Sequence, residues 1–310
     1  MKILNYGSLN VDHVYQMPAF VTAGETLSAT DCATHTGGKG LNQSVALARA
    51  GAEVYHGGKI GADGETLRAF LEKAGVDCTF LRTDPGVPTG HAIIQVVPSG
   101  ENCIMIYGGT NRMVSREEID ETLGHFSAGD YLLLQNEISN VDYLIEKGHE
   151  KGMITVLNPS PITAELLSYK NLGLLDWLIV NRGEAEALSG LAEDGDADGG
   201  KAKDPDAVLA ALRTRYPRAG IVMTLGKHGA VCLRGGEKVT GRTYTYGKRV
   251  DTTGAGDTFT GYFLAGLARG LSLESCMELA GKAAGISITV AGAAVSIPDM
   301  ETVLSSIPLE

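Results

Sequence analysis

The sequence predicts an α/β fold built on a largely parallel β-sheet with helical crossovers. Short apolar runs of buried-strand length alternate along the chain with longer runs that have a helical pattern. Two stretches, residues 12–36 and 88–107, interrupt this alternation because they contain strand-like segments with no helix between them. Strands inserted in this way often form a separate small antiparallel sheet, and such a sheet can cover an active site as a lid.

Each expected element follows from its local pattern. A first strand is expected at residues 2–8, and later apolar runs predict strands at residues 131–134, 154–157, 177–180 and 221–225. Helices are expected at residues 40–50, 141–151, 182–188, 206–216, 258–269 and 274–289. Residues 91–97 and 101–106 form an expected hairpin around Pro98-Ser99-Gly100. We find no internal repeat and no linker, so a single domain is expected over residues 1–310, with both interrupting stretches inserted in it.

Composition narrows the function classes. The chain has 310 residues, of which 44% are hydrophobic and 20% charged, as in a globular protein. Its net charge is −11 and no block is rich in lysine or arginine, which argues against a nucleic-acid partner. An acidic protein that binds anionic ligands must concentrate positive potential locally, through helix termini, metal ions or single lysines.

The cysteines and the apolar stretches indicate a cytoplasmic protein with no membrane partner. There is no C-x-x-C motif, so neither a zinc site nor a disulfide framework is expected for Cys32, Cys78, Cys103, Cys232 and Cys276. The N-terminus lacks the apolar core of a signal peptide. The longest uncharged stretch, residues 283–298, is too short and too small in side-chain size for a membrane span.

The segment Asp251-Thr-Thr-Gly-Ala-Gly-Asp257 is the most informative part of the chain. A glycine-rich turn that opens a helix presents unpaired N–H groups at the positive end of the helix dipole, an arrangement that binds phosphate. Asp257 beside such a phosphate would accept a proton from an attacking hydroxyl. The segment therefore suggests phosphoryl transfer to an alcohol, although an aspartate at a helix start is also common for its effect on the dipole alone.

A second glycine-rich turn, Gly37-Gly-Lys-Gly40, also opens a helix. Its spacing does not fit the P-loop of nucleotide-binding proteins. Lys39 would supply positive charge near a transferred phosphate, and Asn42 would hydrogen-bond a sugar hydroxyl as donor and acceptor. An ordinary glycine turn with a surface lysine is the alternative.

Polar residues follow several of the expected strands, where open parallel sheets bind ligands. Asn10, Asp12 and Glu137 stand at such positions and would grip the hydroxyls of a polyol, or form plain polar turns. Asn181 and Glu184 would either cap a helix or hold magnesium-bound water.

Thr224 and Gly226 follow another strand and would meet nucleotide phosphates through hydroxyl and backbone. The acidic stretch 191–206 begins like a calcium loop, but Pro205 occupies the position that needs a bidentate glutamate, so a surface loop is expected.

These motifs, taken together and in this order, resemble those of the ribokinase-like (PfkB) carbohydrate kinase family. The resemblance covers nearly the whole chain, and the Gly24-Glu-Thr26 segment is most similar in form to the ribokinase branch of that family. Its motifs are Gly7-Ser-Leu-Asn10-Val-Asp12, Gly37-Gly-Lys-Gly-Leu-Asn42-Gln43, Asn158-Pro-Ser-Pro161, Asn181-x-x-Glu184, Thr224-Leu-Gly226 and the Asp251 to Asp257 segment. The resemblance implies a three-layer, Rossmann-like fold with helices on both faces of the sheet and a small β-lid that often joins two subunits in a homodimer.

The resemblance also implies a reaction and a set of roles. The γ-phosphate of ATP passes to a primary hydroxyl of a sugar, with Asp257 as the base and the amides of Gly254, Ala255 and Gly256 as the anion hole. The implied sugar contacts are Asn10, Asp12, Gly38, Lys39, Asn42 and Glu137, together with Asp257. The implied nucleotide contacts are Asn181, Thr224 and Gly226, with Glu184 near Mg²⁺. A K⁺ site is implied at Asp251, Thr253, Ser287, Val290, Gly292 and Ser296.

The sequence departs from the family pattern in three places. Tyr262 stands where a small residue is usual, and His91 opens a lid strand where the ribokinase branch has an apolar residue. Arg182 and Gly183 are unusual within their motif but leave its two key residues intact. The first two departures concern the identity of the substrate more than the type of reaction.

We therefore expect an ATP-dependent sugar kinase, with phosphorylation of D-ribose at O5 as the leading reaction. Fructose, another ketose, a keto-sugar acid or a nucleoside is the alternative acceptor. A catalytically silent sugar-binding or regulatory protein is the alternative of another class. A nicotinamide dehydrogenase is disfavoured because no G-x-G-x-x-G follows the first strand.

Overall fold

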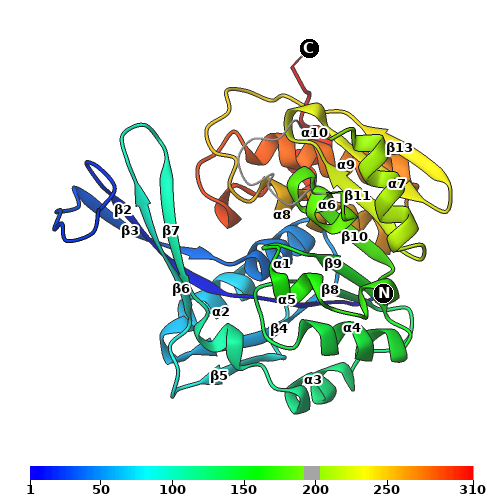
Figure 1. Cartoon of the computed structure of the whole chain (residues 1–310), viewed down its shortest axis with the longest axis horizontal. Helices are drawn as coiled ribbons and strands as arrows, with labels where there is room; N and C mark the ends of the chain where they lie inside the picture. Colours follow the sequence, from blue (N-terminus) through cyan, green and yellow to red (C-terminus); the bar gives the residue numbers. More distant parts are fainter. Residues whose placement is uncertain (192–202, 310) are drawn as a thin grey trace.

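A large, mostly parallel sheet forms the centre of the molecule (Figure 1). The computed structural model describes residues 1–191 and 203–309. The strands of the large sheet are β1 Ile3–Tyr6, β4 Val54–Gly61, β5 Leu81–Asp84, β8 Tyr131–Gln135, β9 Ile154–Asn158, β10 Trp177–Asn181, β11 Gly220–Thr224, β12 Ala230–Arg234 and β13 Glu237–Gly241. They lie in the order β13-β12-β11-β10-β9-β8-β1-β4-β5. All neighbours from β11 to β5 are parallel, and β12 and β13 add an antiparallel edge, which confirms the predicted sheet.

Helices cover both faces of this sheet, so the predicted three layers are confirmed. They are α1 Lys39–Arg49, α2 Glu65–Lys73, α3 Arg116–Leu123, α4 Val141–Glu150, α5 Ala164–Leu167, α6 Arg182–Ser189, α7 Pro205–Arg215, α8 Ala255–Ala268, α9 Leu273–Ser287 and α10 Met300–Ser305. Successive strand residues point to opposite faces: Ile3 packs in the core with α1, α2, α8 and α9, and Leu4 packs in the core with α3, α4, α6 and α7.

Strand β4 has no counterpart in the sequence prediction, because half of it is not apolar. It contains His56, Gly57, Gly58 and Lys59, yet nearly all of the strand is buried. The polar side chains find partners inside the protein: Ser44 Oγ lies 2.8 Å from His56 Nδ1, and Lys59 Nζ donates to the carbonyl of Met113. Burial also lowers the pKa of His56 to about 4, so its ring is neutral at physiological pH.

Helix α8 begins at Ala255 and not at residue 258, so the predicted start was wrong. Gly254 is the N-cap, with a φ of 75° that only glycine adopts without strain. The residues expected to form a separate turn therefore form the first turn of the helix itself. Asp257 lies in that first turn, next to amides that have no acceptor within the helix.

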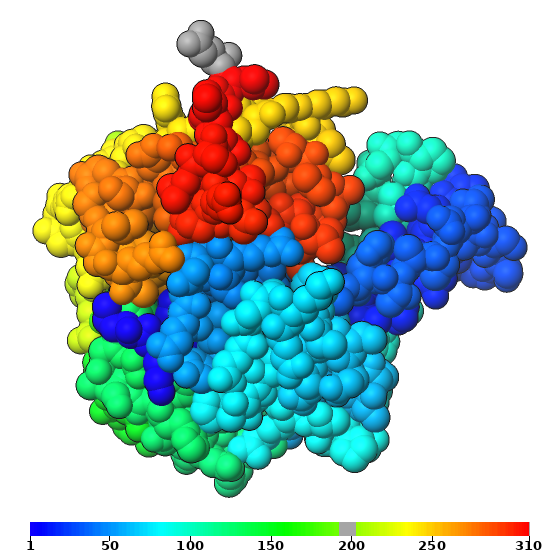
Figure 2. All heavy atoms as spheres, turned by 180° about the vertical axis from the view of Figure 1, so that it is seen from behind, coloured from blue at the N-terminus to red at the C-terminus, as the bar shows by residue number. Residues whose placement is uncertain are grey.

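A separate four-stranded sheet stands beside the main body (Figures 1 and 2). Its strands are β2 Asn10–Gln16, β3 Asp31–Gly37, β6 Gly90–Val96 and β7 Asn102–Tyr107, in the order β3-β2-β6-β7. They come from the two stretches that interrupt the alternation in the sequence, and the predicted hairpin of β6 and β7 is confirmed. The sheet is not wholly antiparallel, because β2 and β6 pair in parallel.

The remaining expectations concern the acidic stretch and membranes. Residues 192–202 lie outside the described residues, and with them most of the predicted surface loop and its calcium-like start. Helix α7 follows, with Pro205 at its first position and Asp204 as N-cap. Within residues 1–191 and 203–309, no helix has the length and apolar character needed to cross a membrane.

Candidate active site

The two glycine-rich helix starts of the sequence meet in one cavity. It measures about 110 Å³, and it opens at the ends of β9, β10 and β11, between α1 and α8. The predicted site residues that line it are Lys39, Asn181, Glu184, Thr224, Gly254, Gly256 and Asp257. Asn158 and Thr260 also line it; the sequence analysis gave neither of them a role.

Close packing of α1 against α8 places the groups around Asp257. A Cβ atom on Gly261 would lie 2.4 Å from Cβ of Ala46, so a larger residue at this position would force the helices apart. At this separation, Asn42 Nδ2 donates to Asp257 Oδ2 at 2.9 Å. Gln43 Nε2 donates to Asp257 Oδ1 at 2.8 Å. The carboxylate is thus held on both oxygens while 7% of the residue stays exposed.

Positive potential in this acidic protein comes from Lys39 and from the first turn of α8. Burial lowers the pKa of the Lys39 ammonium, but nearby negative charges outweigh that effect and raise the pKa above its ordinary value. Those charges belong to Asp257, Glu137 and Glu184. Lys39 therefore keeps its proton, and it lines the same cavity as Asp257.

The first-turn amides of α8 are suited to an anion. The amides of an α-helix's first turn have no acceptor within the helix, and the helix dipole favours negative charge there. The Ala255 amide already donates to the carbonyl of Thr252, over a long 3.3 Å bond for which a phosphate would compete. Gly254 and Gly256 line the cavity directly.

Glu137 joins the start of α1 to the end of β1. It accepts a hydrogen bond from the backbone amide of Lys39 at 3.1 Å and another from the Ser8 hydroxyl. Burial, with the charge of Glu137 added to it, raises the pKa of Asp12 to about 6. Two carboxylates thus lie near the root of the small sheet, on the side of the predicted sugar contacts.

On the side of the predicted sugar contacts, one asparagine side-chain oxygen has no hydrogen-bond partner among the described residues. Asn10 Oδ1 accepts from Asn111 Nδ2 at 2.9 Å, so a buried residue outside the predicted set orients Asn10. Asn42 Nδ2 donates to Asp257, and Asn42 Oδ1 is buried without a partner among the described residues. A buried unpaired acceptor is costly, and a ligand hydroxyl would satisfy it. Gly38, with a φ of 94°, turns the backbone beside them.

On the nucleotide side, Asn181 and Glu184 form a capping box at the start of α6. The Glu184 amide donates to Asn181 Oδ1 and the Asn181 amide donates to Glu184 Oε2, both at 2.9 Å. The capping alternative of the sequence analysis is therefore present, and both residues also face the cavity. Within the described residues no group of three His, Cys, Asp or Glu side chains is placed to hold a metal. A single carboxylate fits Mg²⁺ that keeps most of its water and is bound by substrate phosphates.

Three of the predicted cation positions, Asp251, Thr253 and Gly292, contact one another. Asp251 Oδ1 accepts from the amide and the hydroxyl of Thr253, and Asp251 Oδ2 accepts from the Gly292 amide at 2.9 Å. The amide of Asp251 also donates to Ile288 O, next to Ser287. Val290 is exposed, and the Ser296 hydroxyl donates to Ala293 O at 2.8 Å. A carboxylate with hydroxyls and carbonyls suits a weakly hydrated cation.

The first two departures from the family pattern, Tyr262 and His91, lie in different parts of the fold. Tyr262 is fully buried on α8, and its hydroxyl donates to the carbonyl of Pro298 at 2.6 Å, so this hydrogen bond joins α8 to the C-terminal segment. His91 is the second residue of β6, and its ring centroid lies 6.2 Å from that of His13 and 5.1 Å from that of Tyr107. His91 therefore belongs to an aromatic cluster on the small sheet.

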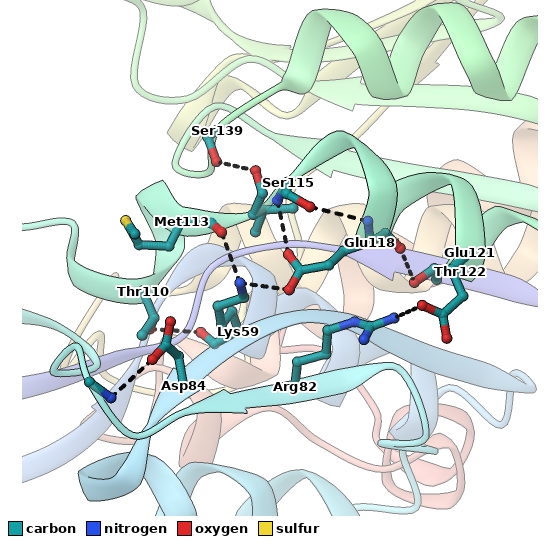
Figure 3. Close-up of polar contacts among 12 residues, drawn as sticks. Lys59, Arg82, Asp84, Thr110, Met113, Ser115, Glu118, Glu121, Thr122 and Ser139 are labelled. Carbon is teal, nitrogen blue, oxygen red and sulfur yellow. Dashed lines mark hydrogen bonds and ion pairs between the residues drawn. The ribbon is translucent and has the colours of Figure 1, made fainter.

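A second, wider cavity of about 420 Å³ lies between β5 and α3, and its chemistry is different (Figure 3). Its two cations are already paired inside the protein. Lys59 Nζ lies 2.7 Å from Glu118, and Arg82 lies 2.7 Å from Glu121. Asp84 accepts from the Gly86 amide. Because its charges are neutralised locally, this cavity does not match the anion-binding character of the first one.

Comparisons with known proteins agree with this geometry. The family described as pfkB family carbohydrate kinase matches residues 1–300. A ribokinase of Haemophilus influenzae is 34% identical over 304 residues, which cover 96% of this chain and 95% of that protein.

Two solved structures show the same similarity. A ribokinase from Cryptococcus neoformans in complex with ADP has a TM-score of 0.85 and 33% identity, and 98% of each chain is covered. A ribokinase from Arabidopsis thaliana complexed with ribose and ATP has a TM-score of 0.83 and 28% identity, covering 98% of this chain and 97% of that one.

Proposed function

The chain belongs to the pfkB family and is an ATP-dependent carbohydrate kinase, and from that premise we propose that its acceptor is D-ribose, phosphorylated at O5. The observation that carries the proposal is the position of Asp257. Its carboxylate lies in the first turn of α8, in one cavity with the Lys39 ammonium. The choice of ribose is supported by relatives that bear the name ribokinase and by one that was solved with ribose and ATP.

In the proposed reaction, Asp257 accepts the proton of the O5 hydroxyl as that oxygen attacks the γ-phosphorus of ATP. The bond from the γ-phosphorus to its bridging oxygen breaks, and ADP leaves. Charge on the transferring group is met by Lys39 and by the amides of Gly254, Ala255 and Gly256. Such transfer depends mainly on positioning and charge stabilisation.

Sugar and nucleotide enter from different sides in this proposal. Asn10, Asp12 and Glu137 would hold sugar hydroxyls beside Gly38 and Lys39, and the unpaired Asn42 Oδ1 would accept from one of them. Asn181, Thr224 and Gly226 would contact the nucleotide. Glu184 would hold Mg²⁺ through water, and the ion would supply charge for the phosphates.

We propose that a K⁺ ion binds at Asp251 and the other predicted cation positions. Burial acts to raise the pKa of this carboxyl, but hydrogen bonds from Thr253 and Gly292 outweigh burial and lower the pKa, so the charge that a cation needs is present. The ion would act by ordering the backbone behind Gly254. The other ligands would come from Thr253, Ser287, Val290, Gly292 and Ser296.

We also propose that the protein is a cytoplasmic homodimer joined through the small sheet. All five cysteines are free, and Cys32 and Cys103 are exposed, which suits a reducing compartment. Strand β7 is an edge strand, and its residues 104–107 are exposed although they are apolar or aromatic.

Substitution of Asp257 with Asn tests the role of the base. We expect kcat to fall about 100- to 10,000-fold, because general-base catalysis is lost while the amide retains the shape of the side chain. The KM for the sugar should change little. Asp206→Asn is the matched control, since Asp206 stands in the first turn of α7, away from the cavity. Full activity of the Asp257→Asn protein would contradict the assignment.

The acceptor is tested by ATP turnover on ribose, 2-deoxyribose, fructose, keto-sugar acids and nucleosides, with Na⁺ or K⁺ as the cation. The proposal predicts the highest kcat/KM with ribose, and stimulation by K⁺. A higher value for another acceptor would overturn ribose but leave the kinase chemistry in place. Sugar binding without any turnover would instead indicate a catalytically silent binding protein.

A further inference from the structure

Gln43 contacts the carboxylate of Asp257, and neither the sequence analysis nor the proposed mechanism gives it a role. The residue is fully buried on α1. Its Nε2 donates to Asp257 Oδ1 at 2.8 Å and to Asn158 Oδ1 at 3.0 Å. Its Oε1 accepts from Gln135 Nε2 at 2.7 Å. Both N–H groups and the carbonyl of this amide are therefore used.

The orientation of the Gln43 amide is determined from one end by a backbone carbonyl. Asn158 Nδ2 donates to Ile179 O at 2.9 Å. A carbonyl oxygen only accepts hydrogen bonds, so the NH₂ group of Asn158 must face Ile179 and its Oδ1 must face Gln43. Gln43 can satisfy that oxygen only with its own NH₂ group.

A second backbone carbonyl determines the same orientation from the other end. Asn5 Nδ2 donates to Gly40 O at 2.7 Å, so Asn5 Oδ1 must face Gln135. Gln135 Nε2 donates to that oxygen at 2.9 Å, and its second N–H points to Gln43. The carbonyl of Gln43 therefore faces Gln135, and its NH₂ group faces Asp257. The two ends agree, although they start from different strands.

This fixed donor selects one state of Asp257. A flipped Gln43 would set its carbonyl against the carboxylate and would break the bonds to Asn158 and Gln135. A carboxyl group protonated on Oδ1 would place a proton against an N–H donor. Both N–H groups and the carbonyl of Gln43 are therefore used only when that oxygen is ionised, and the second lone pair of each Asp257 oxygen stays available to a substrate hydroxyl. Lys39 is the charged group that faces Asp257 from the same helix.

We propose that Gln43 is a positioning residue of the catalytic base: its locked NH₂ group orients the Asp257 carboxylate and keeps it ready to accept a proton. This inference rests on the proposed role of Asp257 as base. The orientation is held by a buried amide chain through Asn158, Gln135 and Asn5. Gln43 itself is fully buried and does not line the cavity.

Two variants, each with one buried glutamine replaced by methionine, distinguish this positioning role from a role in packing alone. Gln43→Met removes the donor to Asp257 with little change in volume. Gln135→Met removes an equally buried amide that does not touch Asp257, and it leaves the Asn158 contact, which by itself holds the Gln43 NH₂ group toward the carboxylate. We expect both variants to melt at lower temperature than the wild-type protein. Only Gln43→Met should also lower kcat, by about 10-fold, because a hydrogen bond to a charged group is lost.

The pH dependence of kcat distinguishes the two roles, because a loss of packing alone would not change it. In Gln43→Met the pH of half-maximal activity on the acidic side should rise by about one unit, since a hydrogen bond that favours the charged form is gone. In Gln135→Met it should stay close to that of wild type, and the KM values should change little in either variant. An unchanged profile in Gln43→Met, or equal shifts in both variants, would overturn the proposal.

A titration without substrate separates this inference from the proposed function. The carboxyl carbons of ¹³C-labelled aspartate are followed by NMR, with the Asp257 signal assigned by its loss in Asp257→Asn. The midpoint of that signal should rise in Gln43→Met and not in Gln135→Met. If the wild-type protein phosphorylates no sugar but this difference is present, the proposed function fails and the positioning contact stands. If the midpoint is the same in all three proteins, the inference about Gln43 fails.

Discussion

At the scale of single residues, Asp12 shows a conflict between stability and ligand binding. Burial and the charge of Glu137 raise the pKa of Asp12 from 3.8 to about 6. A carboxyl with a raised pKa binds its proton more tightly in the folded chain than in the unfolded chain. The resulting stability is complete below pH 3.8 and is lost as the pH rises through about 6. Near neutral pH the folded protein therefore holds an ionised Asp12 at a cost.

Asp12→Asn should remove that cost. We expect the variant to melt at a higher temperature than wild type near neutral pH, and to lose this advantage below the ordinary pKa of aspartate. Its KM for the sugar should rise, because the charged acceptor for a sugar hydroxyl is gone. Thermal melts across pH, paired with sugar titrations, measure both effects. Asp31→Asn, an exposed position on the same small sheet, serves as the control. A variant with unchanged melting at neutral pH would contradict the argument.

At the scale of elements, the packing of α1 on α8 brings together residues from opposite ends of the chain. Asn42 and Asp257 are 215 positions apart and share a hydrogen bond of 2.9 Å. The contact depends on Gly261, which leaves no Cβ between the helices. Tyr262, the next residue, extends to Pro298 and ties the same helix to the C-terminal segment. The fold of the site is therefore sensitive to small changes on one face of α8.

Gly261→Val tests this dependence. The added side chain would collide with Ala46 and should destabilise the protein by about 1–3 kcal/mol, as overpacking of a core does. We expect kcat to fall more than melting alone explains, because Asn42 moves away from the base. Gly173→Ala is the control, since an added methyl there meets nothing within 4 Å. Denaturant unfolding and steady-state kinetics give the two quantities, and a destabilised protein with normal kcat would argue against the coupling.

At the scale of the whole molecule, the small sheet stands beside the body with much of its edge strand exposed (Figure 2). Ile104 is 50% exposed and Ile106 is 63% exposed, and alternate residues on a strand share one face. A monomer would leave these side chains in water. A second copy of the chain that covers the sheet would bury them, which is the basis of the proposed homodimer.

Ile106→Glu should weaken that homodimer. A charge placed in a buried apolar interface is costly to desolvate, so we expect the variant to sediment as a monomer at concentrations where wild type is dimeric. Leu304→Glu, at a 73% exposed position on α10, is a matched control and should leave the assembly unchanged. Analytical ultracentrifugation distinguishes the two states. A wild-type monomer, or an Ile106→Glu dimer, would contradict the proposal.

Much of the fold was predictable, since its signals are local. The buried strands β8, β10 and β11 are short apolar runs, and the interrupted alternation at residues 12–36 and 88–107 marked the separate sheet. Strand β4 was not predictable because its buried polar residues depend on distant partners. The predicted start of α8 was too late because a Gly-Ala-Gly segment has weak helix propensity. In the structure the left-handed Gly254 is the N-cap, and the helix begins at Ala255.

The candidate site was likewise predictable where its signals are local, and not where they depend on distant partners. The turns that carry glycines, the helix starts that carry Lys39 and Asp257, and the carboxylates that follow strands are all visible in the sequence, because each depends on neighbours within one turn or strand. The contacts of Asn42 and Gln43 with Asp257, and the single orientation of the Gln43 amide, follow only from the folded chain. Those contacts arise from the packing of two helices and from backbone carbonyls on other strands, and no local pattern encodes them.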